Sequence, residues 1–577
     1  MDIYHKLKAA INKVITNLYV GETLDLKAIT VESPKDPLHG DLATNAAMVL
    51  AGQLKKSPRE IASILKGALN DLGYISHIEI AGPGFINFTL KPSVWQETID
   101  EILKLGEKYG DSSVGENKKY NVEFVSANPT GPMHIGHARG AVYGDALSRL
   151  LKKAGYQVEK EFYMNDYGGQ IDVLARSAFI RYLECATGEK QNIPEGLYPG
   201  GYLIPVGEAL FKKYGSSLIT ASEEEYLPVI KEVAIAAMME LIKQDLADLN
   251  IKHDIFFSEK SLHSSGEIEK SVAELTSKDL VYKGMLEAPK GMLPEDWEER
   301  EQILFKSTNF GDDQDRALQK SNGQWSYFAA DVAYTKNKID RGFDSLILIL
   351  GADHGGYIKR LEAVAKAYNP LVKLDVKICQ LVNFIKDGEP VKMSKRAGNF
   401  TTVRDVINEV GRDIIRFIML TRKNDAVMDF DLDKVKEQSK DNPVFYVQYA
   451  HVRTKSILEN AKSQLDTAYK DFENSNYDLA LLESEEEMHL IKTLASWPKT
   501  VESAALHAEP HRIAFYLQNL AAEFHALWNL GKEKEYYRFI ITDNEKLTSA
   551  RLALAKAIQL VIRSGLGVLG VEPLDRM

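Results

Sequence analysis

The sequence has few cysteines and no long apolar run, and both shortages narrow the class of protein. Only two cysteines, Cys185 and Cys379, occur in 577 residues, and they lie far apart in the chain. They argue against a disulfide framework and against a cysteine-based zinc site, so we expect no metal site of the protein's own. No apolar run reaches the roughly 18 residues of a membrane span. The first residues lack a signal-peptide core, so we expect a cytoplasmic protein with no membrane partner.

An excess of basic residues is also missing. The chain carries 71 lysines and arginines against 82 aspartates and glutamates, a net charge of −11. Proteins that bind phosphate backbones usually present excess lysine and arginine, so composition argues mildly against a nucleic-acid partner, although a large acidic chain can carry local basic strips. The length allows three or four domains, each with its own core.

The most informative stretch is residues 122–143, which read VEFVSANPTGPMHIGHARGAVY. A β-type run leads into a turn rich in Asn, Pro and Gly, and then into HIGH (residues 134–137) and an alanine-rich helical pattern. A strand, a tight turn and a helix start present free backbone N–H groups and a positive dipole end to an anion. Gly136 lets a nucleotide approach the backbone, and the imidazoles of His134 and His137 can reach phosphate oxygens.

A second signature follows about 250 residues later. Residues 392–395 read KMSK and are followed by arginine, alanine and glycine. Two lysines on a loop can neutralise a departing pyrophosphate as point charges. Exposed lysines are usually only solvated, so this interpretation depends on the presence of HIGH upstream.

HIGH after a strand, with KMSK downstream, resembles the class I aminoacyl-tRNA synthetases. The strings HGDLATNAA, AGPGFINF, NDYGGQ and VEFVSANPTGPMHIGH resemble the arginyl-tRNA synthetases more narrowly. The resemblance implies an arginine–tRNA ligase that uses ATP with Mg²⁺ to make arginyl-adenylate and then esterifies the 2′-hydroxyl of the terminal adenosine of tRNA(Arg). It also implies that activation needs tRNA. We expect a monomer.

The resemblance also implies site residues. The catalytic residues would be His134, His137, Lys392 and Lys395. ATP would be bound by these histidines and Lys395 together with Gly136, Met393 and Ser394. Because guanidinium is a planar, permanently charged donor, its pocket should offer carboxylates and carbonyl-type acceptors. The arginine-binding residues would be Glu123, Ser126, Asn128, Gln170, Tyr327, Asp331 and His354. In this set Asp331 and Glu123 would pair with the guanidinium.

One departure from the family pattern bears on these roles. Many arginyl-tRNA synthetases have lost the second KMSK lysine and carry a lysine shortly before HIGH. This chain has Gly131 in that region and an intact KMSK. The combination assigns the pyrophosphate role to Lys395.

The predicted fold is multidomain α/β. Strand and helix alternate after residue 117, which favours a Rossmann-like parallel sheet whose strands end in polar residues. We expect an N-terminal α+β domain (1–112), a catalytic domain (113–370) with insertions near 185–320, a KMSK region (371–440) and an all-α helical bundle (441–577). The resemblance implies that the first contacts the tRNA elbow, the third the acceptor stem and the last the anticodon. Within the catalytic domain the sheet is expected to resume near residues 325–334 and to include 346–350, and residues 405–420 are expected to form one helix.

Two other interpretations remain open. The chain could be another HIGH/KMSK enzyme, for a different amino acid or a small nucleotidyltransferase, or a catalytically silent RNA-binding paralogue. The GxGxxG match at residues 565–570 does not add a dinucleotide-binding hypothesis, because too few residues follow it for a βαβ unit and it fits the end of a helix.

Overall fold

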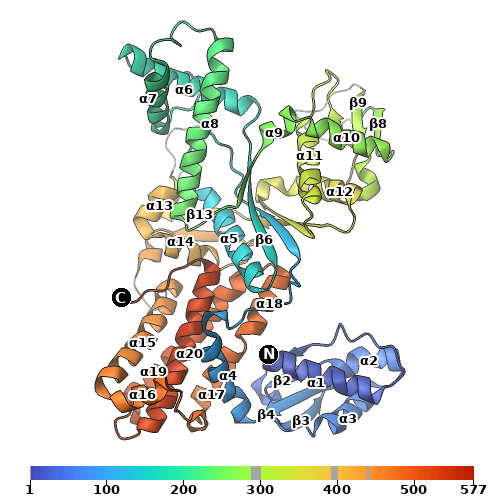
Figure 1. Cartoon of the computed structure of the whole chain (residues 1–577), viewed down its shortest axis with the longest axis vertical. Helices are drawn as coiled ribbons and strands as arrows, with labels where there is room; N and C mark the ends of the chain where they lie inside the picture. The colour runs from blue at the N-terminus through green and yellow to red at the C-terminus, as the bar shows by residue number, and fades with distance from the viewer. Residues whose placement is uncertain (1, 35, 287–300, 391–400, 438–441) are drawn as a thin grey trace.

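The computed structural model describes residues 2–34, 36–286, 301–390, 401–437 and 442–577, and a parallel five-stranded sheet lies at its centre (Figure 1). Its order is β12-β11-β5-β6-β7, and every neighbouring pair is parallel. The strands are β5 (Lys119–Glu123), β6 (Gln157–Met164), β7 (Ile255–Ser258), β11 (Ser345–Gly351) and β12 (Lys373–Cys379). β6 and β7 lie on one side of β5, and β11 and β12 lie on the other side. Because the strand order reverses between β5 and β11, a crevice opens at the carboxyl ends of these two strands.

The HIGH residues begin the helix that follows β5. A short 3-10 turn, η3 (Ile135–His137), continues into α5 (Ala138–Lys153). Gly144 in α5 lies against Phe124, since a Cβ there would come within 2.3 Å of that ring. This close approach sets the helix directly on the end of β5.

Between β6 and β11 the chain adds two insertions. The first, helical, consists of α6 (Gly169–Thr187), η4 (Gly201–Leu203), α7 (Ile204–Tyr214) and α8 (Glu223–Asp248). The second consists of α9 (Glu259–Ser264), α10 (Glu267–Ser277), β8 (Val281–Gly284), β9 (Gln302–Phe305), η5 (Ser307–Phe310), β10 (Arg316–Gln319) and α11 (Tyr327–Asp340). The sequence suggested insertions near 185–320; in the structure they begin at Gly169 and are separated by β7, which belongs to the sheet.

The expected return to the sheet at residues 325–334 is wrong. These residues begin α11, whose N-cap Ser326 accepts a hydrogen bond from the backbone N–H of Ala329 through its side chain. A serine cap of this kind satisfies one of the free N–H groups of the first turn. The predicted strand at 346–350 is confirmed as β11, and η6 (Ala352–Tyr357) and α12 (Ile358–Tyr368) follow it.

A small sheet and two short helices connect the catalytic sheet to the rest of the chain. They are β13 (Val382–Lys386), β14 (Glu389–Pro390), α13 (Val403–Val410), α14 (Arg412–Met419), β15 (Met428–Asp431) and η8 (Lys434–Lys436). The single helix expected over 405–420 is therefore wrong. Gly411, with φ of 85°, breaks it in a left-handed conformation that glycine adopts without steric strain.

The N-terminal unit is α+β, as predicted. Its four-stranded sheet has the order β1-β2-β4-β3, and residues 77–90 lie in the expected hairpin. The elements are α1 (Ile3–Leu18), β1 (Val31–Glu32), η1 (Pro37–His39), β2 (Leu42–Thr44), α2 (Ala46–Leu54), α3 (Pro58–Leu69), β3 (Ile75–Ala81), β4 (Phe85–Leu90), α4 (Pro92–Leu105) and η2 (Gly106–Lys108). Helix α4 lies beside the C-terminal bundle (Figure 1), where Gln96 donates a hydrogen bond to the carbonyl of Leu482.

The C-terminal part is a helical bundle, which confirms the predicted class. It contains α15 (Pro443–Gln464), α16 (Asp466–Glu473), η9 (Leu479–Leu481), α17 (Glu485–Ala495), α18 (Trp497–His507), α19 (His511–Glu533), η10 (Glu535–Tyr537) and α20 (Glu545–Leu569). Helix α20 is apolar and long enough to cross a membrane, but 78% of its most apolar window is buried, as in the core helix of a bundle. Gly570 ends it in the left-handed conformation, so the GxGxxG match is a helix end.

A buried ion cluster centred on Asp145 of α5 joins the bundle to the catalytic sheet. The Asp145 carboxylate lies 2.7 Å from Arg416, 2.7 Å from Arg149 and 3.0 Å from Lys160. Arg416 also donates to the carbonyls of Leu569 at the end of α20 and of Leu249 after α8. A Cβ on Gly570 would lie 2.1 Å from this guanidinium, so only glycine fits there.

Candidate active site

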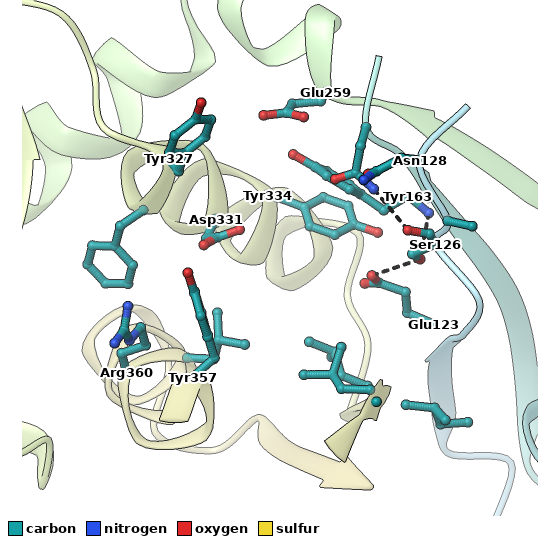
Figure 2. Close-up of a pocket in the computed structure, with 18 of the residues that line it drawn as sticks. Glu123, Ser126, Asn128, Tyr163, Glu259, Tyr327, Asp331, Tyr334, Tyr357 and Arg360 are labelled. Carbon is teal, nitrogen blue, oxygen red and sulfur yellow. Dashed lines mark hydrogen bonds between the residues drawn. The ribbon is translucent and has the colours of Figure 1, made fainter. Parts of the chain in front are cut away.

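A cavity of about 1570 Å³ opens at the carboxyl ends of the sheet strands (Figure 2). His134, Gly136 and His137 line one part of it, as the sequence predicted. The two imidazole rings stack with centroids 3.7 Å apart. These three of the six residues predicted to bind ATP therefore line the same cavity as the arginine-binding residues described next.

The end of β5 is folded sharply to present polar groups to this cavity. Val125 and Ser126 both have positive φ values, 73° and 38°, which are uncommon outside glycine and typical of functional sites. Three hydrogen bonds fix the second of them. The Ser126 hydroxyl donates to Glu123 at 3.1 Å and accepts from the Tyr163 N–H at 3.1 Å, and the Ser126 carbonyl accepts from the Asn165 amide at 2.9 Å.

Asn128 and Gln170 lie together at the mouth of the cavity. The Asn128 amide donates to the Gln170 side-chain carbonyl at 2.9 Å, although Asn128 follows β5 and Gln170 lies in the first turn of α6. Both line the cavity. The pair leaves amide groups available to the polar end of an amino acid.

Tyr327 and Asp331 lie four residues apart on α11, so both side chains face the cavity from one side of a helix. Figure 2 shows Asp331 between Tyr327 and Tyr357. Burial, together with the negative charge of Glu123, raises the pKa of Asp331 to about 7, and the positive charge of Arg360 only partly offsets this. Among the described residues no hydrogen bond or ion pair to the Asp331 carboxylate is found, so it offers its charge to a ligand.

Glu123 lies in the cavity wall, but its carboxylate already has a cationic partner. The Lys338 ammonium, which is buried, pairs with Glu123 Oε2, while Ser126 donates to Oε1. The sequence predicted that Glu123 would pair with a guanidinium. In the structure the Glu123 carboxylate is instead paired with Lys338. Lys338 is 215 residues away in the chain, so no local sequence pattern could connect the two residues.

Glu259 is a cavity residue that the sequence interpretation missed. It follows directly after β7, is 7% exposed and lines the cavity together with Asp331. Burial, with the nearby charges of Asp331 and Asp166, raises the pKa of Glu259 to about 7. A signal was present: Ser258-Glu259 ends a short Ile-Phe-Phe run, the kind of polar strand end that was used to find the other residues.

Five predicted residues cannot be placed. Lys392, Met393, Ser394 and Lys395 lie outside the described residues. The backbone of His354 lies in η6, but its side chain is outside the described part of the structure.

Three family models match the chain. Residues 98–459 match the catalytic domain of class I (R) tRNA synthetases, residues 3–90 match the arginyl tRNA synthetase N terminal domain, and residues 447–577 match the DALR anticodon binding domain. The parallel sheet with HIGH at its carboxyl edge is accordingly that of a class I aminoacyl-tRNA synthetase.

Individual relatives narrow the class. The Arginine--tRNA ligases of Rickettsia felis and Rickettsia bellii are each 58% identical to this chain, with 100% of both chains covered. A crystal structure from Campylobacter jejuni, described as an arginyl-tRNA synthetase, matches with 31% identity and a TM-score of 0.72 over 85% of this chain and 100% of that one. The Thermus thermophilus arginyl-tRNA synthetase has the same fold, with 19% identity and a TM-score of 0.72 over 100% of both chains. The chain belongs to the arginyl-tRNA synthetase family, which confirms the resemblance noted in its motifs.

Proposed function

We propose that the cavity is where this chain carries out the reaction of its family, the charging of tRNA with arginine. Asp331 and Glu259 pair with the guanidinium of L-arginine, and Tyr327 packs along it. Asn128 and Gln170 bind the α-amino and carboxylate end, while Ser126 fixes the turn. The observation that carries this proposal is the presence, in one cavity, of two carboxylates with raised pKa values beside the HIGH histidines.

The first step we propose is attack of the arginine carboxylate on the α-phosphate of ATP. It forms arginyl-adenylate and expels pyrophosphate. The chain contributes mainly by placing the reactants in line and by neutralising negative charge as it grows. His134, His137 and the N–H groups at the start of α5 hold the triphosphate, and Lys392 and Lys395 meet the pyrophosphate. The 2′-hydroxyl of the terminal adenosine of tRNA(Arg) then takes the arginyl group and releases AMP.

Mg²⁺ accompanies ATP in this proposal. Among the described residues no group of three or more His, Cys, Asp or Glu side chains gathers as a metal site. Magnesium is commonly held by substrate phosphates and water with few protein ligands, so the nucleotide itself would carry it. Its positive charge would add to that of the lysines on the phosphate oxygens.

The remaining parts of the proposal concern tRNA and the cell. The N-terminal unit (1–112) contacts the tRNA elbow, the 371–440 region contacts the acceptor side, and the bundle (441–577) binds the anticodon. The match of residues 447–577 to an anticodon binding domain supports the last of these. We further propose a cytoplasmic monomer in which arginine activation requires bound tRNA.

Aminoacylation of total tRNA with each of the standard amino acids, supplied labelled, tests the proposal. Charging with arginine alone is expected. Charging with another amino acid would keep the class I fold and reject Asp331 and Glu259 as guanidinium ligands, and absence of all charging would favour a silent RNA-binding protein. Pyrophosphate exchange with and without tRNA tests the requirement for tRNA separately. Lys395→Ala should lower exchange by orders of magnitude with little change in stability.

A further inference from the structure

The backbone that carries HIGH is bound to the chain that follows KMSK. The Met133 carbonyl accepts a hydrogen bond from the Val403 N–H at 2.9 Å, and the Ile135 N–H donates to the Thr401 carbonyl at 3.1 Å. Residues 134 and 402 thus form an antiparallel bridge. Backbone hydrogen bonds thus join the HIGH segment to the residues that follow the KMSK motif.

A single buried carboxylate clamps both sides of that ladder. Asp245, in the last turn of α8, is 1% exposed. Its Oδ2 accepts from the Met133 N–H at 2.9 Å, on the HIGH side. Its Oδ1 accepts from the guanidinium of Arg404 at 3.2 Å, on the α13 side. Asp248, one turn further along, also pairs with Arg404, at 2.7 Å.

The position of Asp245 is unfavourable on local grounds. The carboxyl end of a helix carries a partial negative charge, which disfavours an acidic side chain, and α8 has no basic residue in its last turn. Burial also raises the pKa of Asp245, despite the hydrogen bond from Met133 and the charge of Arg404. Asp245 does not stabilise α8, and its burial disfavours ionisation. We therefore attribute its presence at this position to the contacts that it makes outside the helix.

We propose that Asp245 is a positioning residue for the activation step: through Met133 and Arg404 it fixes the HIGH segment against the start of α13, where the chain returns from KMSK. This inference rests on the proposed role of HIGH and KMSK in ATP binding. Neither Asp245 nor Arg404 lines the cavity. Asp245 therefore acts on ATP and pyrophosphate through the backbone and leaves the arginine pocket unchanged. Figure 1 shows α8 extending from the helical insertion to α13, so the clamp also lies at the foot of that insertion.

The test is pyrophosphate exchange in the full-length enzyme with tRNA present, with KM measured separately for ATP and arginine. Asp245→Ala removes both contacts and should lower kcat/KM for ATP roughly ten- to hundredfold, since each is a hydrogen bond involving a charged group. The KM for arginine should stay within about twofold. Asp245→Asn can keep its carbonyl oxygen as the acceptor for Met133 but loses the negative charge and the acceptor that meets Arg404, so it should recover part of the loss.

Asp248→Asn is the matched control, because it weakens the Arg404 pair without touching the HIGH segment, and it should leave kcat/KM for ATP within about twofold. Arg404→Gln and the double variant with Asp245→Asn complete a cycle, in which non-additive losses are expected because the two residues share one contact. The inference is overturned if Asp245→Ala behaves like Asp248→Asn, or if KM rises equally for both substrates. If Asp245→Ala does not fold, kcat/KM for ATP is compared between Asp245→Asn, Arg404→Gln and the control Asp248→Asn, and equal values would overturn the inference. Failure of the wild-type chain to charge arginine would instead reject the proposed function itself.

Discussion

Asp145 in α5 and Asp331 in α11 are carboxylates on two helices of the catalytic region, and the cations around them differ. Burial alone would raise the pKa of Asp145, but Arg416, Arg149 and Lys160 outweigh it and lower that pKa to about 2. Among the described residues no cation bonds to Asp331, and burial raises its pKa to about 7 although the charge of Arg360 offsets part of this rise. The chain itself therefore neutralises the Asp145 carboxylate, whereas the Asp331 carboxylate is neutralised only when a cationic ligand binds.

The comparison separates stability from function in a protein rich in buried ions. Breaking a buried pair leaves a charge without compensation and destabilises the fold, while a carboxylate left uncompensated by the chain is stabilised only when a cation binds. Glu123 resembles Asp145, because Lys338 pairs with it. Glu259 resembles Asp331, because the cation nearest to it among the described pairs is His263 at 3.9 Å, and burial lowers the pKa of that imidazole. Three variants, in decreasing order of effect, and then the pH dependence test this division.

Arg416→Met should have the largest effect. It removes the guanidinium that bonds Asp145 and the carbonyls of Leu569 and Leu249, and we expect the free energy of unfolding to fall by about 3–5 kcal/mol. Urea denaturation measures it. The control Arg412→Met removes a more exposed pair with Glu572 and should change stability by less than about 1 kcal/mol. Equal stabilities for the two variants would mean that the Asp145 cluster is not structural.

Asp331→Asn should leave the fold intact and weaken arginine binding. The apparent KM for arginine is expected to rise roughly 30-fold or more, because the guanidinium loses a charged partner in a partly buried site. Stability should stay the same or rise, since an uncompensated carboxylate is removed. Asp340→Asn, on the same helix but exposed, is the control. A fall in kcat with unchanged KM would contradict the pocket assignment.

Glu259→Gln tests which glutamate belongs to the pocket. We expect about a tenfold rise in KM for arginine and little change in thermal stability. Glu123→Gln should do the reverse, because it leaves the buried Lys338 ammonium without its anion. If Glu123→Gln raised KM and preserved stability, the pairing first predicted for Glu123 would be restored.

The pH dependence should have opposite signs in the two regions. Asp331 and Glu259, with pKa values of about 7, become protonated as the pH falls from 8 to 6, so the KM for arginine should rise about tenfold for each carboxylate that must be ionised. Without arginine, these raised pKa values favour folding at low pH, and that contribution is lost as the pH rises through 7. Asp145 contributes stability above about pH 3.8 that is lost as the pH falls towards 2. A KM for arginine that is flat between pH 6 and 8 would show that neither pocket carboxylate titrates there.

Much of this site could be predicted from sequence because its motifs are local. A strand, a turn and HIGH are contiguous, so the position of His134 and His137 at the sheet edge follows from one stretch of chain. The secondary structure around Tyr327 and Asp331 was wrong, since an aromatic and alanine-rich run with few long side chains fits a strand as well as a helix. The N-cap Ser326 was the decisive signal for a helix.

Contacts between distant residues could not be predicted. Lys338 reaches Glu123, and Asp245 reaches Met133 across 112 residues, only because the sheet order and the insertions bring them together. Glu259 was missed for a different reason. Its strand, β7, lies inside the range assigned to insertions, so its polar end was not compared with the ends of the other strands.

The Arg416 cluster also has a consequence for how the chain is made. Asp145 precedes Leu569 by 424 residues, and Arg416 needs the carbonyl of the latter to complete its contacts. At about 5–20 residues per second, a ribosome takes roughly 20 to 85 s to synthesise that interval. Arg149 and Lys160 follow Asp145 closely in the chain, but Arg416 comes 271 residues later and Leu569 later still, so the cluster stays incomplete throughout that time. The contacts that join α5 to the end of α20 can therefore form only after nearly the whole chain has been synthesised.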